Sequence, residues 1–125
     1  MLGVIFRYIG DGMKTPPATL DPVTVLAALA NVNRWQIVAQ MATGAELTLG
    51  SAMQATGRSY KAVHKDMEVL WASGAVAVRY AKDGRVGIFY VPEQYRPKPG
   101  VVDYGFCRLR FGVKEEEPVS PFAKD

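Results

Sequence analysis

Residues 56–76 read TGRSYKAVHKDMEVLWASGAV, and this stretch predicts a tight turn followed by a helix. Ser59 is of a type favoured immediately before a helix, where its hydroxyl can accept from a backbone N–H of the first turn. Gly57 and Gly74 lie on either side and tolerate the positive φ angles at which helices end. We therefore expect a helix over residues 59–73, entered through a turn at Gly57.

The predicted helix has two unlike faces. One side is apolar at the spacing i, i+4 and i+7, with Val63, Met67 and Leu70. The opposite side carries charge, with Lys61, Lys65 and Glu68. Such a helix buries its apolar side in the protein and turns the charged side outward, where a partner could bind.

Two helices are predicted upstream. Asp21 and Pro22 are a capping residue and a proline at the first helical position, and the helix that they begin should end near Asn31. Its apolar residues at helical spacing are Val23, Leu26, Ala27 and Ala30. Asn33 can cap a second helix, from Arg34 to about Thr43, which Gly44 stops. The expected buried face of this second helix consists of Trp35, Ile37, Val38 and Met41.

The next segments predict a third helix and a hairpin. Thr48 can cap a helix that Gly57 ends, while Glu46 and Leu47 before it leave room for only a very short strand. The third helix repeats the helical spacing with Leu49, Ala52, Met53 and Thr56. After residue 74, AVAVRYAKDGRVGIFYV (75–91) contains two β-rich runs around Asp83 and Gly84, a strong hairpin signal.

The C-terminal part begins with prolines at positions 92, 97 and 99, which mark a linker. Residues 100–113, GVVDYGFCRLRFGV, predict one strand that packs on the body of the domain or is exchanged with a second subunit. Its two faces consist of Tyr104, Phe106, Arg108 and Arg110, and of Cys107, Leu109, Phe111 and Val113. The final residues, EEEPVSPFAKD (115–125), are expected to form a mobile acidic tail.

The order helix, helix, short strand, helix, turn, helix and hairpin is typical of a winged helix-turn-helix. The predicted fold class is therefore α+β, a helix bundle with a two-stranded wing and a strand-like C-terminal extension. We expect an N-terminal extension over residues 1–20, the winged domain over 21–95 and the C-terminal extension over 96–125. Met13 is an alternative start, which would leave the first twelve residues untranslated.

The amino-acid composition indicates a globular protein. The chain has 125 residues, of which 49% are hydrophobic and 22% charged, values near the average of globular proteins. The single cysteine, Cys107, cannot close an intrachain disulfide, so a reducing cytoplasm is the expected compartment. The opening MLGVIFRYIG lacks a basic leading segment and a cleavage site, and no apolar run approaches the roughly 20 residues of a spanning helix. We expect neither export nor membrane binding.

The net charge of +3 is concentrated in one part of the chain. Residues 1–57 and 86–125 are each neutral, so residues 58–85 hold the whole excess. The basic residues there are Arg58, Lys61, Lys65, Arg79, Lys82 and Arg85, and the acidic ones are Asp66, Glu68 and Asp83. A local basic patch suits a polyanion, although a solvated helix face with internal ion pairs would have the same composition.

Residues 26–91 resemble the DNA-binding domain of ArsR-type and related MarR-type bacterial repressors. The residues that carry the resemblance are LAALANVNRWQIVAQM (26–41), Gly57 in the turn, Val63, Met67 and Leu70, SGAV (73–76) and KDGRVGIFYV (82–91). The resemblance implies a sequence-specific regulator that binds double-stranded DNA as a homodimer. The expected DNA contacts are Ser59, Tyr60, Lys61, His64 and Lys65 on the fourth helix and Lys82 and Arg85 on the wing.

Other interpretations of these residues stay open. Lys61 and Lys65 could only keep the surface soluble, Tyr60 could pack on its own helix, and a lone surface histidine such as His64 often has no function. A winged helix can also bind proteins without binding DNA. Many ArsR-type sensors bind metal through cysteine pairs or histidine and carboxylate clusters, which one Cys and one His cannot provide. We expect no metal or other cofactor, and the absence of catalytic motifs indicates that the protein is not an enzyme.

Overall fold

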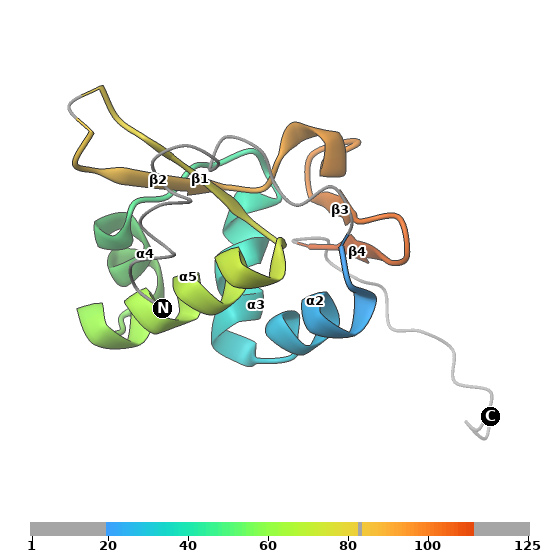
Figure 1. The fold of residues 1–125 in the computed structure, drawn as a ribbon, viewed down its shortest axis with the longest axis horizontal. Coiled ribbons are helices and arrows are strands. Elements are labelled where there is room, and N and C mark those ends of the chain that lie inside the picture. Colours follow the sequence, from blue (N-terminus) through green and yellow to red (C-terminus); the bar gives the residue numbers. More distant parts are fainter. Residues whose placement is uncertain (1–19, 83, 112–125) are drawn as a thin grey trace, which may run out of the picture.

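The computed structural model describes residues 20–82 and 84–111. The expected N-terminal extension up to residue 19, the alternative start at Met13, Asp83, Val113 and the acidic tail lie outside the described residues. Within this part of the chain, four α-helices precede two small antiparallel hairpins, arranged in space as in Figure 1. The elements are α2 (Pro22–Leu29), α3 (Val32–Met41), α4 (Leu49–Thr56), α5 (Tyr60–Ser73), β1 (Ala77–Tyr80), β2 (Gly87–Tyr90), η2 (Glu93–Tyr95), β3 (Val101–Asp103) and β4 (Arg108–Arg110). The α+β winged-helix prediction is confirmed.

Helix α2 begins as predicted, because the Asp21 carboxylate accepts from the backbone N–H of Thr24 at 3.0 Å and Pro22 occupies the first position. The residues that gave the helical spacing are not the ones that pack inward. The buried residues are Val25, Ala28 and Leu29, whereas Val23 and Leu26 are exposed. Seven of the eight residues from 23 to 30 are apolar, so helical spacing fits more than one face, and packing against α5 selects the actual one.

Helix α3 begins two residues earlier than predicted. The side chain of Asn31, rather than that of Asn33, accepts from the backbone N–H groups of Asn33 and Arg34, at 2.9 and 3.1 Å. Both asparagines can cap a helix, but α2 ends at Leu29 and the short connection places Asn31 at the cap. The helix ends at Met41 rather than Thr43. Trp35, expected on the buried face, is exposed instead, and its ring lies 4.5 Å from that of Phe111.

The turn and the two helices at its sides follow the sequence prediction. Thr48 caps α4 and forms a capping box with Ser51, and Gly57 ends the helix in the left-handed region, at φ 71°. Ser59 caps α5 through a bond from the N–H of Ala62, at 3.2 Å, and Gly74 ends it at φ 88°. These local signals confirm the turn and both helix boundaries.

The wing is the antiparallel pair β1–β2, in which Val78 lies opposite Phe89. Leu47 adds a single-residue bridge to Phe89, with backbone hydrogen bonds of 2.9 and 2.7 Å, so the very short strand predicted there is one residue long. The strands stop at Tyr80 and Gly87, on either side of a longer connection than Asp83 and Gly84 alone suggest. A bond from Ala81 N–H to the Val86 carbonyl, at 2.9 Å, closes its base.

The single strand predicted over residues 100–113 is wrong, because β3 and β4 form a second hairpin. Gly105, at φ 100°, makes the turn between them, and its N–H donates to the Asp103 carboxylate at 2.8 Å. The turn also separates Tyr104 from Arg108 and Arg110, with which it was expected to share a face. Tyr104 is buried, and its hydroxyl donates to the carbonyl oxygen of Ala75 at 2.8 Å.

The segment predicted as a linker lies against the helices. Gly100 N–H donates to the Ala42 carbonyl at 2.9 Å, and the Gly100 carbonyl accepts from Phe111 N–H at 2.6 Å. Arg96 Nε donates to the Val91 carbonyl at 2.9 Å. These bonds hold the β3–β4 hairpin next to the end of α3.

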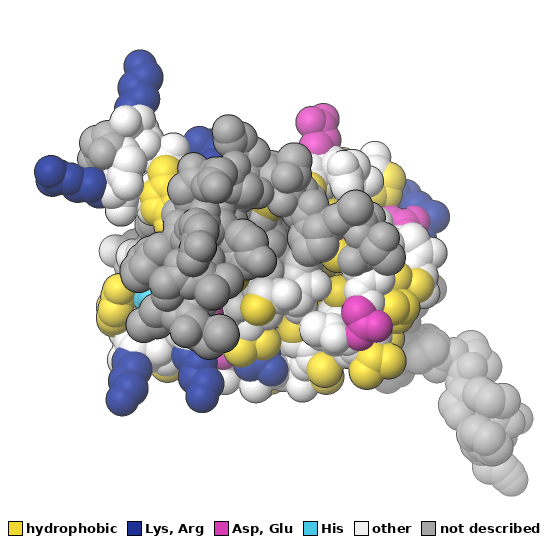
Figure 2. Space-filling view, viewed as in Figure 1, with side chains coloured by type: hydrophobic (Ala, Val, Ile, Leu, Met, Phe, Trp, Pro, Cys, Tyr) yellow, Lys and Arg dark blue, Asp and Glu magenta, His cyan; other side chains and the backbone are white. Residues whose placement is uncertain are grey.

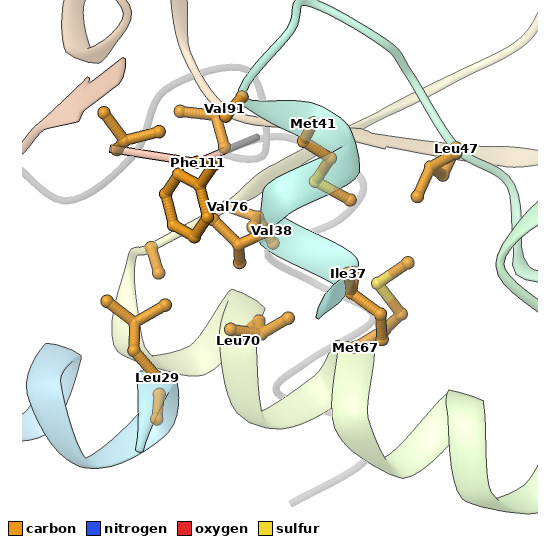
Figure 3. Packing of buried hydrophobic residues seen from close by; sticks show 14 of the residues in the cluster. Leu29, Ile37, Val38, Met41, Leu47, Met67, Leu70, Val76, Val91 and Phe111 are labelled. Atoms are coloured by element: carbon orange, nitrogen blue, oxygen red, sulfur yellow. The ribbon is translucent and has the colours of Figure 1, made fainter. Parts of the chain in front are cut away.

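The hydrophobic core lies between α3, α5 and the start of the wing (Figure 3). Ile37 and Val38 of α3 face Met67 and Leu70 of α5, and Phe111 from the C-terminal hairpin closes the core. Burial of α5 along this seam fixes which side of the helix remains outside.

Candidate nucleic-acid interface

The outward side of α5 is the centre of the candidate interface. Val63, Met67 and Leu70 are fully buried, as predicted, which turns Lys61 and Lys65 into solvent one helical turn apart. A buried apolar stripe on a 3.6-residue period leaves the opposite stripe available to a ligand. The major groove of B-form DNA is about 12 Å wide and can accommodate an α-helix such as α5.

The start of α5 carries three further predicted site residues. The hydroxyl of Ser59 is exposed but serves as the helix cap, accepting from Ala62 N–H. Tyr60 is exposed, and its ring lies 5.7 Å from the imidazole of His64, tilted by 39°. Tyr60 therefore packs on its own helix and still presents its ring to solvent. His64 is exposed beside the two lysines.

The wing brings Lys82 and Arg85 into solvent on either side of its tip. Figure 1 shows that the tip and the start of α5 point toward the same end of the molecule, away from the β3–β4 hairpin. Lys and Arg side chains project from this end over both elements, as Figure 2 shows. The structure thus gathers the basic residues of α5 and of the wing at one end.

Ion pairs within the described part of the chain involve Arg79 and Arg58. Arg79 pairs with Glu46 on the surface, and Arg58 pairs with Asp66. Counting charge along the sequence could not show the pair of Arg79 with Glu46, because these residues are 33 positions apart and meet only through the fold. Because Glu46 neutralises Arg79, the patch is narrower than the sequence indicates, and its exposed basic residues include Lys61, Lys65, Lys82 and Arg85.

Sequence reasoning missed a buried ion cluster beneath α5. The Asp66 carboxylate lies between the guanidinium groups of Arg58 and Arg34, with an Arg34 Nη1 to Asp66 Oδ1 distance of 3.4 Å. A signal was present in the sequence. Asp66 stands three residues after Val63 and four before Leu70, at a spacing that the helical period assigns to the core. A carboxylate at such a position requires a cationic partner, because an unpaired buried charge is very costly.

A cleft of about 460 Å³ separates α5 from the wing. Apolar side chains such as Met67, Trp71 and Phe89 line it, and His64, Glu68 and Arg85 stand among them. Its lining comes from α5, from the wing and from the start of α4, where Thr48, Leu49 and Gly50 lie.

Over residues 20–82 and 84–111, no group of three or more His, Cys, Asp or Glu side chains could hold a metal ion. In the same part of the chain, no helix is long and apolar enough to cross a membrane.

The described fold is similar to solved structures of winged-helix proteins. HlyU from Vibrio cholerae N16961 matches with a TM-score of 0.51 and 24% identity, over 56% of this chain and 73% of the HlyU chain. Reduced HlyU from the same source also matches with a TM-score of 0.51, over 70% of its chain. NolR from Sinorhizobium fredii has a TM-score of 0.49 and 21% identity, over 56% of this chain and 67% of its own. No family model and no curated protein matches the sequence. HlyU supports the winged-helix architecture.

Proposed function

We propose that the protein is a sequence-specific, double-stranded DNA-binding regulator of transcription, similar to the ArsR type, and that it acts in the cytoplasm as a homodimer. The observation that carries the proposal is the outward stripe of α5, with Lys61 and Lys65, at the same end of the molecule as the basic wing tip. HlyU, whose solved structure is similar over 56% of this chain, supports the winged-helix architecture that the proposal requires.

The proposed contacts divide by role. Lys61 and Lys65, with Tyr60 and His64 beside them, would approach base edges in the major groove. Lys82 and Arg85 on the wing would contact the phosphate backbone or the adjacent minor groove, and backbone contacts position a protein without reading sequence. Ser59 would contribute mainly through the geometry of the helix start, since its hydroxyl is bonded to Ala62 N–H.

The test is fluorescence anisotropy of labelled duplexes, one selected from bound genomic fragments and one scrambled, at two salt concentrations. We expect tighter binding to the selected duplex. We also expect affinity for both duplexes to fall steeply with salt, because the protein would displace counterions from phosphates. Equal and salt-insensitive affinities would contradict the proposal.

Exposed apolar residues support the homodimer. Among the described residues, four of the seven exposed large hydrophobic side chains lie on α2 and the first turns of α3, namely Val23, Leu26, Val32 and Trp35. Figure 2 shows apolar side chains at the end of the molecule opposite the wing tip. A second subunit bound there would leave both wing ends free for two half-sites of DNA. Sedimentation equilibrium would give the mass of a dimer, whereas a monomer mass at all concentrations would contradict this part of the proposal.

The same apolar residues favour one alternative function, a winged helix that binds another protein without binding DNA. In that case duplex DNA would have no measurable affinity at low salt, whereas a regulator would bind it. The anisotropy titration therefore separates the two functions.

A further inference from the structure

The ion cluster beneath α5 contains two cations for one anion. The carboxylate of Asp66 contacts Arg34 through one oxygen and Arg58 through the other. The side chain of Asp66 is 8% exposed, that of Arg34 is 17% exposed and that of Arg58 is 31% exposed. One positive charge in the cluster is therefore not neutralised within it, and the more exposed of the two guanidinium groups belongs to Arg58.

The two arginines have different surroundings. Arg34 also donates from Nε to the carbonyl oxygen of Ala28 at 2.5 Å, which ties it to the end of α2. Arg58 lies in the turn between α4 and α5, where its backbone N–H donates to the hydroxyl of Thr56 at 3.3 Å. Among the described residues, Asp66 is the one partner of the Arg58 guanidinium, and that contact uses Nη1. Arginine carries five N–H donors in a planar fork, so donors remain for a second anion.

Arg58 lies at a position where a bound anion would be stabilised. It immediately precedes Ser59, the cap of the 14-residue helix α5, whose first N–H groups and dipole favour negative charge. A guanidinium that is already held in place loses less conformational entropy when it binds than a free side chain does. The fork also matches the geometry of phosphate oxygens.

We propose that the α4–α5 turn is a phosphate-binding site, in which Arg58 contacts a phosphodiester of duplex DNA and Asp66 positions its guanidinium. The inference rests on the proposed DNA-binding function and adds a contact that is absent from the predicted set of site residues. Arg58 binds the phosphate, Asp66 is a positioning residue, and Arg34 holds Asp66 from the protein side.

The test measures how binding to a random-sequence duplex depends on salt, by anisotropy at four salt concentrations. For Arg58→Ala, the slope of log affinity against log salt should fall by about 0.9, because one fewer phosphate is neutralised. Arg58→Gln should lower the slope equally while keeping a hydrogen-bonding partner for Asp66. Arg110→Ala is the matched control. It removes one exposed arginine from β4, on the hairpin that lies away from the wing tip, and should leave the slope unchanged.

Asp66→Asn distinguishes positioning from simple electrostatics. The substitution removes a negative charge near the DNA, so a merely repulsive role for Asp66 predicts tighter binding. Positioning predicts the opposite, a loss of affinity of several-fold, because the Arg58 guanidinium is no longer held by a charged partner. Circular dichroism would verify that each variant is folded.

The outcomes separate the two proposals. A wild-type protein that binds DNA, together with folded Arg58→Ala and Arg58→Gln variants of unchanged slope, would overturn the phosphate site and leave the proposed function intact. Wild-type protein that binds no duplex at any salt concentration would overturn both. Tighter binding by Asp66→Asn would overturn the positioning role.

Discussion

Cys107 shows how the fold changes the chemistry of a single residue. Its thiol is partly buried in the β3–β4 hairpin, and burial raises its pKa, with a further contribution from the negative charge of Asp103. Because thiolate is the reactive form, a raised pKa lowers the fraction that can react near neutral pH. The sequence shows only that the cysteine has no partner, whereas its reactivity depends on neighbours that the hairpin supplies.

We expect Cys107 to react with a disulfide reagent more slowly at pH 8 than free cysteine does. Denaturation in guanidinium chloride should restore the rate of an ordinary thiol. The measurement is the rate of 5,5′-dithiobis(2-nitrobenzoic acid) reduction with and without denaturant. A native rate equal to or above that of free cysteine would show that the pKa is not raised.

Among residues, the limit of sequence reasoning is clearest at Asp66 and Tyr104. Val63, Met67 and Leu70 were predicted in the core because period and apolar character agree. Asp66 lies at a position that the helical period assigns to the core, but its side chain is charged. Its partners Arg34 and Arg58 are 32 and 8 positions away. Tyr104 reaches Ala75, 29 positions away. Contacts at such separations leave no periodic signal.

At the scale of elements, the boundaries that were predicted correctly depend on local chemistry. Thr48, Gly57, Ser59 and Gly74 cap or stop their helices through bonds to residues at most five positions away. For α2, helical spacing alone does not identify the buried face, because almost every residue of that helix is apolar. For residues 100–113, the turn signal of Gly105 was overlooked between two runs that each resemble a strand.

The buried face of α2 can be tested with a matched pair of leucines on that helix. Leu29 is 3% exposed and Leu26 is 44% exposed. Leu29→Ala should lower the free energy of unfolding by about 2–5 kcal/mol, because it removes buried methyl groups and leaves a cavity. Leu26→Ala should cost less than about 1 kcal/mol in the monomer. Urea denaturation at low protein concentration measures both, and equal losses would mean that α2 is packed differently.

At the scale of the whole molecule, the C-terminal hairpin and the winged helix share one core. Val102, Tyr104 and Phe111 belong to the same buried cluster as α3 and α5. The hydroxyl of Tyr104 is bonded to the carbonyl of Ala75, at the junction of α5 and the wing. We therefore expect removal of residues 100–125 to lower the stability of the remaining chain, and thermal unfolding of the truncated protein would show it.

The Tyr104 contact should also make stability depend on alkaline pH. Burial raises the pKa of the Tyr104 phenol above its usual value. The contribution of the neutral phenol is thus complete below the unfolded-state pKa of about 10 and is lost as pH rises toward the folded-state pKa. At pH 7, Tyr104→Phe should be less stable by about 1 kcal/mol, the typical worth of a hydrogen bond.

Above pH 10 this deficit should shrink or reverse, because phenylalanine has no proton to lose. Urea denaturation of both proteins at pH 7 and at pH 10.5 measures the difference, and the other tyrosines cancel because both proteins contain them. A deficit that stays constant between the two pH values would refute the titration of Tyr104 as its cause.

The central claim is that α5 contacts the bases of DNA while the wing contacts its backbone or the adjacent minor groove. Three variants measured together test this claim most directly. They are Lys61→Ala on α5, Arg85→Ala on the wing, and Lys98→Ala, a control that removes one exposed lysine from the chain between the two hairpins. Each is titrated by anisotropy against a selected duplex and a scrambled duplex at two salt concentrations.

Lys61→Ala should weaken binding to the selected duplex by about 1–3 kcal/mol more than to the scrambled one, as expected for loss of a base contact. Arg85→Ala should weaken both equally and lower the salt slope by roughly one. Lys98→Ala should bind as the wild type does. Identical affinities of Lys61→Ala, Arg85→Ala and wild type on every duplex would contradict DNA binding through α5 and the wing.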